Sequence, residues 1–146
     1  MNSEMTDLAR EAVAADGYHL MRGMTLTSSE ITVLVTHRLF DCHDVPTGFW
    51  ETEPIEGEML PRSPLVIHED DEWWPVLEDA ATRGCLLEMV RELFVAPVFV
   101  ERRGIQARVT KWMDLVRGTD LVSRITDWRP TEAHALVTAL KAGGER

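Results

Sequence analysis

The sequence predicts an α+β fold, in which about three helices pack on a small antiparallel sheet. Three segments with helical periodicity lie near the beginning, the middle and the end of the chain. Between them lie short segments rich in β-branched residues, whose alternation is typical of strands with one buried face. Helices and strands that are separated in this way indicate helices covering one face of an antiparallel sheet.

Length and composition set the limits of that fold. The chain has 146 residues, of which 45% are hydrophobic. We expect a single domain over residues 1–146 with a core of its own, which excludes an intrinsically disordered chain. No uncharged run approaches the roughly 20 residues of a membrane span, and no basic start followed by an apolar stretch predicts a signal peptide. Because only Cys42 and Cys85 are present, we expect reduced thiols in a cytoplasm.

The first predicted elements are a helix at 3–16 and a strand at 30–37. Ser3 can cap the start of the helix, and Gly17 can end it in the left-handed conformation. The strand alternates Ile and Val with Thr and Leu, which favours a pleated surface. The apolar stripe of the helix consists of Met5, Leu8, Ala9, Ala12 and Val13.

Residues 41–79 are predicted to form an irregular acidic region. Four prolines and two glycines fall between residues 41 and 64, where they interrupt regular elements. Short strands are expected at 49–50, 59–60 and 64–68. A connection of this length is uncommon within a compact domain and is typically functional or mobile.

The strongest predicted helix spans residues 79–94 and begins at Asp79, a residue type that caps helix starts well. Cys85 and Met89 are expected on the flank of its apolar face. That face is predicted to consist of Leu86, Leu87, Val90, Leu93 and Phe94.

The remaining elements are strands and a last helix. A hairpin is predicted at 95–101 and 105–112, with a turn at Arg102-Arg103-Gly104, because apolar and polar residues alternate over 105–110. A further strand is expected at 121–128. The last helix begins at Thr131 and ends at Gly143, a residue type that is common just past helix ends.

Two segments of this half resemble a family. Residues 74–94 read WPVLEDAATRGCLLEMVRELF, and residues 131–142 read TEAHALVTALKA. They are similar to uncharacterised small proteins encoded by phages and prophages, which share a pattern close to PDLDDPATxGCLLALVREAWG, followed by a few strands and a TEAEALVAALEA helix. The resemblance implies a phage or prophage origin and a shared fold, and it brings no chemistry.

The chain departs from that pattern at the start of two helices. Ala80 stands where the pattern has proline, and His134 stands where it has glutamate. Without that glutamate the capping box Thr-x-x-Glu is lost, so we expect Thr131 to cap the last helix alone. Neither change threatens the fold.

The acidic charge is concentrated in one part of the chain. Residues 41–80 hold twelve acids and one base, whereas residues 1–40 have a net charge of −2 and residues 81–146 of +3. Such a surface repels phosphate backbones, so we expect no direct nucleic-acid binding. It attracts basic protein surfaces and can mimic nucleic-acid charge. The alternative is that acidic loops only keep a small protein dispersed in water.

The candidate binding site is an acidic run followed by two tryptophans. Consecutive tryptophans point to opposite sides of the chain, so that one can enter the core while the other stays near the surface. A tryptophan ringed by acids is typical of a hot spot for a basic partner, although both rings can equally pack under the following helix. We hypothesise a non-enzymatic accessory protein that binds a host or anti-phage-defence protein in the bacterial cytoplasm. The site comprises Glu69, Asp70, Asp71, Glu72, Trp73 and Trp74, with Trp50 as a second anchor.

Two alternatives concern the rest of the chain. Arg102, Arg103 and Arg108, together with an aromatic ring, can hold a small nucleotide near the hairpin tip. An exposed turn with a charged strand face is the simpler explanation of these arginines. A homodimer joined along a sheet edge is a further possibility.

A metal- or cysteine-dependent enzyme is the least favoured function. The segment Asp41-Cys42-His43-Asp44, with His37 and His68, holds metal-capable residues, but adjacent ligands seldom face one metal and no zinc spacing is present. Cys85 lies near a helix start, where a thiol becomes reactive, but it also lies near an apolar stripe and has no identifiable catalytic partner. We therefore expect no metal, no cofactor and no catalytic residue.

Overall fold

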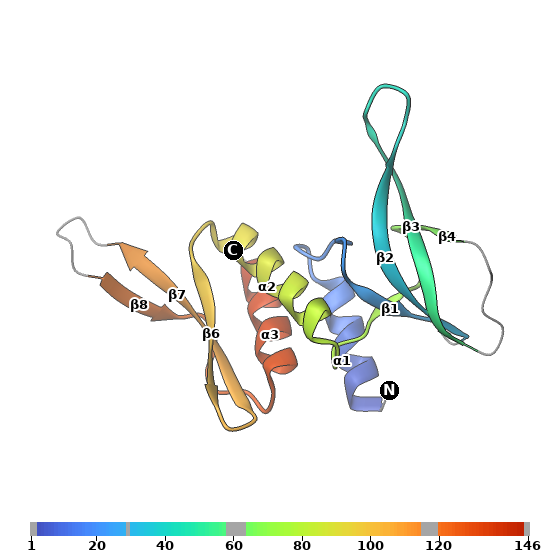
Figure 1. Ribbon diagram of the computed structural model, residues 1–146. Helices are drawn as coiled ribbons and strands as arrows, with labels where there is room; N and C mark the ends of the chain where they lie inside the picture. Colours follow the sequence, from blue (N-terminus) through green and yellow to red (C-terminus); the bar gives the residue numbers. More distant parts are fainter. Residues whose placement is uncertain (1–2, 29, 58–63, 115–119, 145–146) are drawn as a thin grey trace.

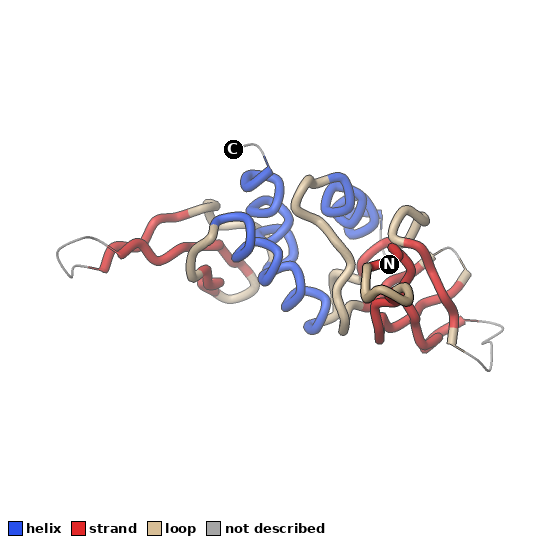
Figure 2. The backbone as a smooth tube through the Cα atoms, turned by 90° about the horizontal axis from the view of Figure 1, so that it is seen from above, coloured by secondary structure: helices blue, strands red, loops and turns tan. Residues whose placement is uncertain are grey.

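The computed structural model describes residues 3–28, 30–57, 64–114 and 120–144, and it confirms the α+β class. Within these ranges, three helices lie in the middle of the molecule and an antiparallel sheet lies at each end (Figure 1; Figure 2). The helices therefore separate two sheets, where the sequence predicted one small sheet. The helices are α1 (Ser3–Ala14), α2 (Ala80–Phe94) and α3 (Glu132–Gly144).

The larger sheet has five strands in the order β4-β3-β2-β1-β5, and the smaller has three in the order β6-β7-β8. All neighbouring strands are antiparallel. The five-stranded sheet consists of β1 (Thr25–Thr27), β2 (Ile31–Phe40), β3 (Pro46–Gly57), β4 (Leu65–His68) and β5 (Trp74–Pro75). The three-stranded sheet consists of β6 (Val98–Arg103), β7 (Gln106–Asp114) and β8 (Asp120–Arg124).

The prediction of an irregular connection is wrong for residues 46–57, which form β3 and pair with β2 along its length. The prolines fit because Pro46 is the first residue of the strand and Pro54 lies beside a register shift, where the ladder is already interrupted. The expected strand at 64–68 is β4. The expected strand at 59–60 lies outside the described residues.

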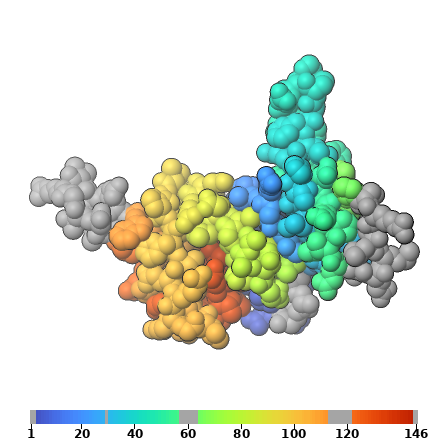
Figure 3. All heavy atoms as spheres, viewed as in Figure 1, coloured from blue at the N-terminus to red at the C-terminus, as the bar shows by residue number. Residues whose placement is uncertain are grey.

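The far end of the β2–β3 hairpin projects from the body of the molecule (Figure 3). Its turn is held by Asp41, whose backbone N–H donates to the Val45 carbonyl over 2.9 Å. The Asp41 carboxylate accepts from the backbone N–H groups of His43 and Val45 at 2.8 and 3.0 Å. Cys42 and His43 therefore lie in an exposed polar turn.

Two other turns differ from expectation. Gly17 follows α1 but is not among the described glycines with positive φ, so the predicted left-handed helix end is wrong at this position. In the β6–β7 hairpin, Arg103 pairs directly with Gln106, so that Gly104 and Ile105 alone form the turn. Gly104 has φ of 63°, which is the conformation that glycine tolerates best.

The core lies where the helices meet the inner faces of both sheets. Each fully buried aliphatic side chain there contributes about 1.5–3 kcal/mol through removal from water. Cys85 belongs to this core, in agreement with its predicted place beside the apolar face of the helix. Within the described ranges, no helix has the length and apolarity that crossing a bilayer requires. The largest fully buried side chains are Met24, Leu26, Leu77, Leu86, Met89, Leu136 and Leu140.

The N-terminus of α2 is capped as predicted, and the cap also joins the helix to β1. The Asp79 carboxylate accepts from the Thr82 backbone N–H at 2.9 Å and from the Thr82 hydroxyl at 2.8 Å. The same hydroxyl accepts from the backbone N–H of Thr25 at 2.9 Å. A local capping interaction thereby fixes the position of β1 against the helix.

The N-terminus of α3 departs from the prediction of a lone threonine cap. The Thr131 hydroxyl accepts from the His134 backbone N–H at 3.3 Å, and it also lies 2.6 Å from His134 Nδ1. The histidine thus occupies the place of the missing glutamate in the capping box. Its Nε2 atom lies 3.0 Å from Glu4, which joins α3 to the first turn of α1.

We expect Val95→Gly to stabilise the protein by about 1 kcal/mol, because Val95 ends α2 in the left-handed conformation with φ of 48°. Its side chain is 88% exposed, so little packing is lost with it. Thermal unfolding should show a rise of about 3 °C. Val95→Ala, which keeps a Cβ atom in the strained position, should gain less, and a lower Tm for the glycine variant would contradict the argument.

Candidate functional site

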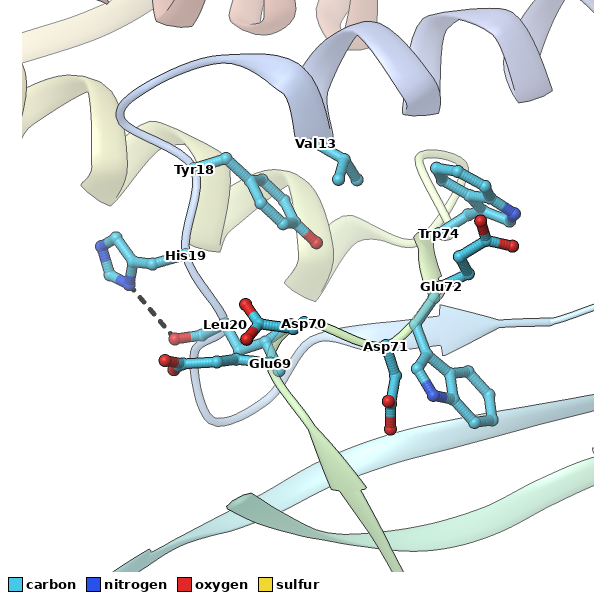
Figure 4. A pocket seen from close by; sticks show the side chains of 10 residues that line it. Val13, Tyr18, His19, Leu20, Glu69, Asp70, Asp71, Glu72 and Trp74 are labelled. Atoms are coloured by element: carbon cyan, nitrogen blue, oxygen red, sulfur yellow. Dashed lines mark hydrogen bonds between the residues drawn. The ribbon is translucent and has the colours of Figure 1, made fainter. Parts of the chain in front are cut away.

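The predicted acidic and aromatic residues line a pocket of about 500 Å³ between the turn at 69–72 and the C-terminal end of α1 (Figure 4). One wall is the turn itself, and another is the segment that follows α1. We call this cavity the acidic pocket. It is lined by Val13, Tyr18, His19, Leu20, Glu69, Asp70, Asp71, Glu72, Trp73 and Trp74.

The acidic turn is held in place by its own backbone and by Asp71. The Asp71 carboxylate accepts from the His68 backbone N–H at 2.9 Å, and the Asp71 N–H donates to the His68 carbonyl at 3.0 Å. The Glu69 N–H donates to the Gly48 carbonyl of β3 at 2.9 Å. Asp71 therefore stabilises the turn. The other three acids, Glu69, Asp70 and Glu72, supply negative charge that a ligand can meet.

Those three carboxylates are available for a ligand. Asp70 Oδ2 lies 3.6 Å from His68 Nδ1, with an Asp70 side chain that is largely exposed. Within the described residues, the Glu69 and Glu72 carboxylates have no ion pair or hydrogen bond. Negative charge gathered without internal partners favours a cationic ligand.

The two tryptophans are both half-buried and both pack against the core. Trp74 is held by pairing of β5 with β1, in the register Thr27 to Trp74. The Arg10 guanidinium lies 5.5 Å from the centroid of the Trp74 ring, within cation–π distance. Neither ring is wholly exposed or wholly enclosed.

Tyr18 is the pocket residue that the sequence did not single out. Its hydroxyl points into the pocket (Figure 4) and has no hydrogen-bond partner among the described residues. Burial raises the pKa of the Tyr18 hydroxyl above its usual range, with a smaller contribution from Cys85. The hydroxyl therefore stays protonated at neutral pH and can donate to a ligand. No spacing in the sequence relates Tyr18 to residues 69–74, which come from a distant part of the chain.

Trp50 is not an exposed anchor, contrary to expectation. It lies in β3 opposite Arg38 and Ile67 and is only 6% exposed. The Arg38 guanidinium lies 5.4 Å from its ring centroid. Because the region around it is a regular strand, period-two alternation places this ring on the inner face of the sheet.

The three candidate arginines do not converge on one site. Arg102 bonds to Glu132 of α3 with its Nη2 at 2.7 Å, on the helix side of the sheet. Arg103 and Arg108 lie on the opposite face, where their guanidinium carbons are 4.4 and 4.5 Å from the Trp128 ring centroid. Arg108 also donates twice to Glu101, at 2.9 and 2.7 Å. The hydrogen bonds from Arg108 are the main reason that the pKa of the Glu101 carboxyl is lowered. The arginines are thus already engaged by acids and by an aromatic ring.

The metal and cysteine candidates are separated by the fold. Within the described ranges, no group of three or more His, Cys, Asp and Glu side chains is placed to hold a metal ion. Cys85 is buried and its Sγ lies 3.7 Å from the Arg22 carbonyl. Burial raises the pKa of the Cys85 thiol, and the nearby Asp79 and Glu88 carboxylates add to this. The reactive thiolate is therefore disfavoured.

Comparison of this chain with known proteins found no relative. Searches against protein-family models, curated proteins and solved structures each gave no match.

Proposed function

We propose that this protein acts by binding and that the acidic pocket receives a basic segment of a host or anti-phage-defence protein. The observation that carries the proposal is a cavity of about 500 Å³ whose acidic wall faces aromatic side chains and an unpartnered hydroxyl. The phage context rests on the resemblance of residues 74–94 and 131–142 to phage-encoded proteins.

Charge is the first argument for a basic ligand. Among the described residues, the Glu69 and Glu72 carboxylates have no ion pair or hydrogen bond, and the largely exposed Asp70 carboxylate lies 3.6 Å from His68 Nδ1. The base among the lining residues is His19, and it already lies 2.9 Å from Glu92 of α2. The neighbouring bases are Arg10, over the Trp74 ring, and His68, 3.6 Å from Asp70, so a lysine or arginine side chain entering the pocket would still meet an excess of negative charge. The same charge would accelerate encounter with a basic protein.

The aromatic wall is the second argument. Tyr18, Trp73 and Trp74 supply large apolar surfaces against which the aliphatic part of a lysine or arginine can pack. Aromatic rings also attract cations through their faces. The buried Tyr18 hydroxyl, which lacks a partner among the described residues, can donate to a carbonyl of the bound segment. A buried donor without a partner costs about 1–3 kcal/mol, so a ligand acceptor at this point gains free energy.

Charge removal at the pocket tests the proposal. The triple variant Glu69→Gln, Asp70→Asn and Glu72→Gln should bind oligolysine and oligoarginine peptides at least about tenfold more weakly than the unaltered protein. Its binding should also depend less on salt concentration, because fewer charges are screened. Asp71 is left unchanged, since it holds the turn. Titration followed by tryptophan fluorescence measures both effects, because two tryptophans line the pocket.

The matched control removes three charges elsewhere. Glu30, Glu53 and Glu56 are exposed and lie outside the pocket. Their triple replacement by glutamine should change peptide affinity by less than about twofold. Equal loss of affinity in both triples would show attraction to the acidic protein as a whole, and the pocket would then have no specific role. If the pocket is confirmed, capture from host lysate identifies the partner. The partner is the protein that the unaltered chain and the Glu30, Glu53 and Glu56 variant both recover, and that the Glu69, Asp70 and Glu72 variant does not.

A further inference from the structure

His68 is the last residue of β4 and stands directly before the acidic turn at 69–72. Its Nδ1 atom accepts a hydrogen bond from the backbone N–H of Asp70 over 3.1 Å. An imidazole nitrogen accepts only when it carries no hydrogen, so His68 is neutral in this arrangement and its hydrogen lies on Nε2. The contact is similar to an Asx turn, in which a side-chain oxygen accepts from the backbone two residues later. The observed form of the turn therefore depends on an uncharged histidine.

Strand β3 holds the imidazole ring on its other sides. The Phe49 ring meets it edge to face, with the centroids 4.7 Å apart and the planes at 76°. The Nε2 atom lies beside Gly48, where an added Cβ atom would be 2.9 Å away. The ring is thus enclosed by β3 and by the turn. With 30% of its side chain exposed, His68 can still exchange protons with water.

The charged groups around the ring come from the turn and from two strands. Asp70 Oδ2 lies 3.6 Å from His68 Nδ1. Glu51 shares the face of His68, because Phe49 pairs with His68 and side chains two apart in a strand point the same way. The full set of titratable neighbours is Glu69, Asp70 and Asp71 on the turn, Glu51 on β3, and His37 opposite Glu51 on β2. Four of these five groups are carboxylates, so a positive charge on His68 would find partners.

Protonation of His68 removes the acceptor for the Asp70 backbone. Both nitrogens of an imidazolium carry hydrogen, so Nδ1 would then face the Asp70 N–H as a second donor. Turning the ring over does not help, since Nε2 carries hydrogen as well. The Asp70 carboxylate offers an acceptor to the new N–H, because its Oδ2 atom lies 3.6 Å from Nδ1. A protonated His68 would therefore release the Asp70 backbone and pair with the Asp70 side chain.

We propose that His68 regulates the acidic pocket through its own protonation. Neutral His68 keeps the turn in its observed form, with the Asp70 carboxylate on the pocket wall. Protonated His68 pairs with that carboxylate, alters the turn and so takes one negative charge away from the ligand. Histidine changes charge between about pH 5 and pH 8, so mild acid weakens the binding of a basic segment. This inference rests on the proposed function of the pocket and adds a regulation to it.

Two measurements test this regulation separately. The first needs no ligand: in an NMR titration from about pH 8 to about pH 5.5, the Asp70 amide signal should move together with the His68 ring signals. The second is calorimetric titration with oligolysine, whose side chains stay charged over this range. Its affinity should fall at least about threefold between about pH 7.5 and about pH 5.5 at constant ionic strength, because one charge of the pocket is neutralised.

His68→Asn is the variant that isolates protonation. The asparagine side chain can accept from the Asp70 N–H, as in an Asx turn, and it does not titrate. This variant should lose most of the fall in affinity, and its Asp70 amide signal should stay in place. His37→Gln is the matched control, because this exposed histidine lies on β2 and outside the pocket. It should keep the fall in affinity.

The outcomes separate this regulation from the proposed function. An Asp70 amide signal that does not follow the His68 titration would overturn the regulation. So would a His68→Asn variant whose affinity falls with pH as much as that of the unaltered protein. Absence of oligolysine binding at both pH values would contradict the proposed function instead. The amide titration would then still decide whether the turn responds to His68.

Discussion

Replacing Thr82 by valine should destabilise the protein by about 3 kcal/mol, or roughly 150-fold in the folding equilibrium. Thr82 is fully buried. Its hydroxyl joins the backbone N–H of Thr25 to the carboxylate of Asp79, at 2.9 and 2.8 Å. Valine has nearly the same shape, so it opens no cavity. It leaves a buried N–H without an acceptor, which costs about 1–3 kcal/mol, and it removes a donor from the half-buried Asp79 carboxylate, which adds a smaller cost.

Urea denaturation measures this cost as a lower midpoint with an unchanged slope. Thr82→Ser is the matched control, because it keeps the hydroxyl and removes only a methyl group. We expect it to cost about 1 kcal/mol. If serine proves as harmful as valine, the methyl group and its packing matter more than the hydrogen bonds. The position of β1, and through it the β5 residue Trp74 in the acidic pocket, would then depend on packing.

Local signals in the sequence were sufficient for the three helices and for the N-terminal cap of α2. The Asp79 cap of α2 and the apolar stripes of all three helices are set by residues within a few positions of one another. The β6–β7 hairpin was predictable for the same reason. The α3 start was misjudged because histidine is not the usual residue of a capping box, although its ring nitrogen can meet the Thr131 hydroxyl.

The five-stranded sheet was less predictable because its pairing is not local. Prolines and glycines around Trp50 suggested irregular structure, but β2 provides a partner strand that accommodates them at its end and at a register shift. β5 has only two residues and exists because β1 lies beside it. The composition of the acidic pocket could be predicted from residues 69–74, whereas Tyr18 could not, since only the folded chain brings it there.

The sequence predicted that Gly17 ends α1 in the left-handed conformation. In the structure, glycine stands at this position because a side chain there would collide with Leu93. A Cβ atom at this position would lie 2.4 Å from Leu93 Cδ1 and 2.8 Å from Leu93 Cδ2 and Cγ. Gly143 of α3 also lies against the Leu93 side chain. A Cβ atom there would lie 2.8 Å from Leu93 Cδ1. One leucine of α2 is therefore enclosed by the glycines that follow α1 and end α3.

We expect Gly17→Ala to destabilise the protein by about 2 kcal/mol, because the added methyl group overpacks the space occupied by Leu93. Leu93→Ala alone should cost about 2 kcal/mol through lost packing. In the double variant the two costs should not add. The three atoms nearest to the new Cβ are Cδ1, Cδ2 and Cγ of Leu93, and alanine lacks all three.

A double-mutant cycle by urea denaturation measures this coupling. We expect Gly17→Ala to cost less than about 0.5 kcal/mol in the Leu93→Ala background, since the clash has been removed. Gly23→Ala is the contrasting control: no atom lies within 4 Å of its added Cβ, but its φ of 96° makes any side chain strained. Its cost should therefore be the same with leucine or alanine at position 93. Additive costs at Gly17 would mean that the backbone after α1, and not the volume of Leu93, selects glycine there.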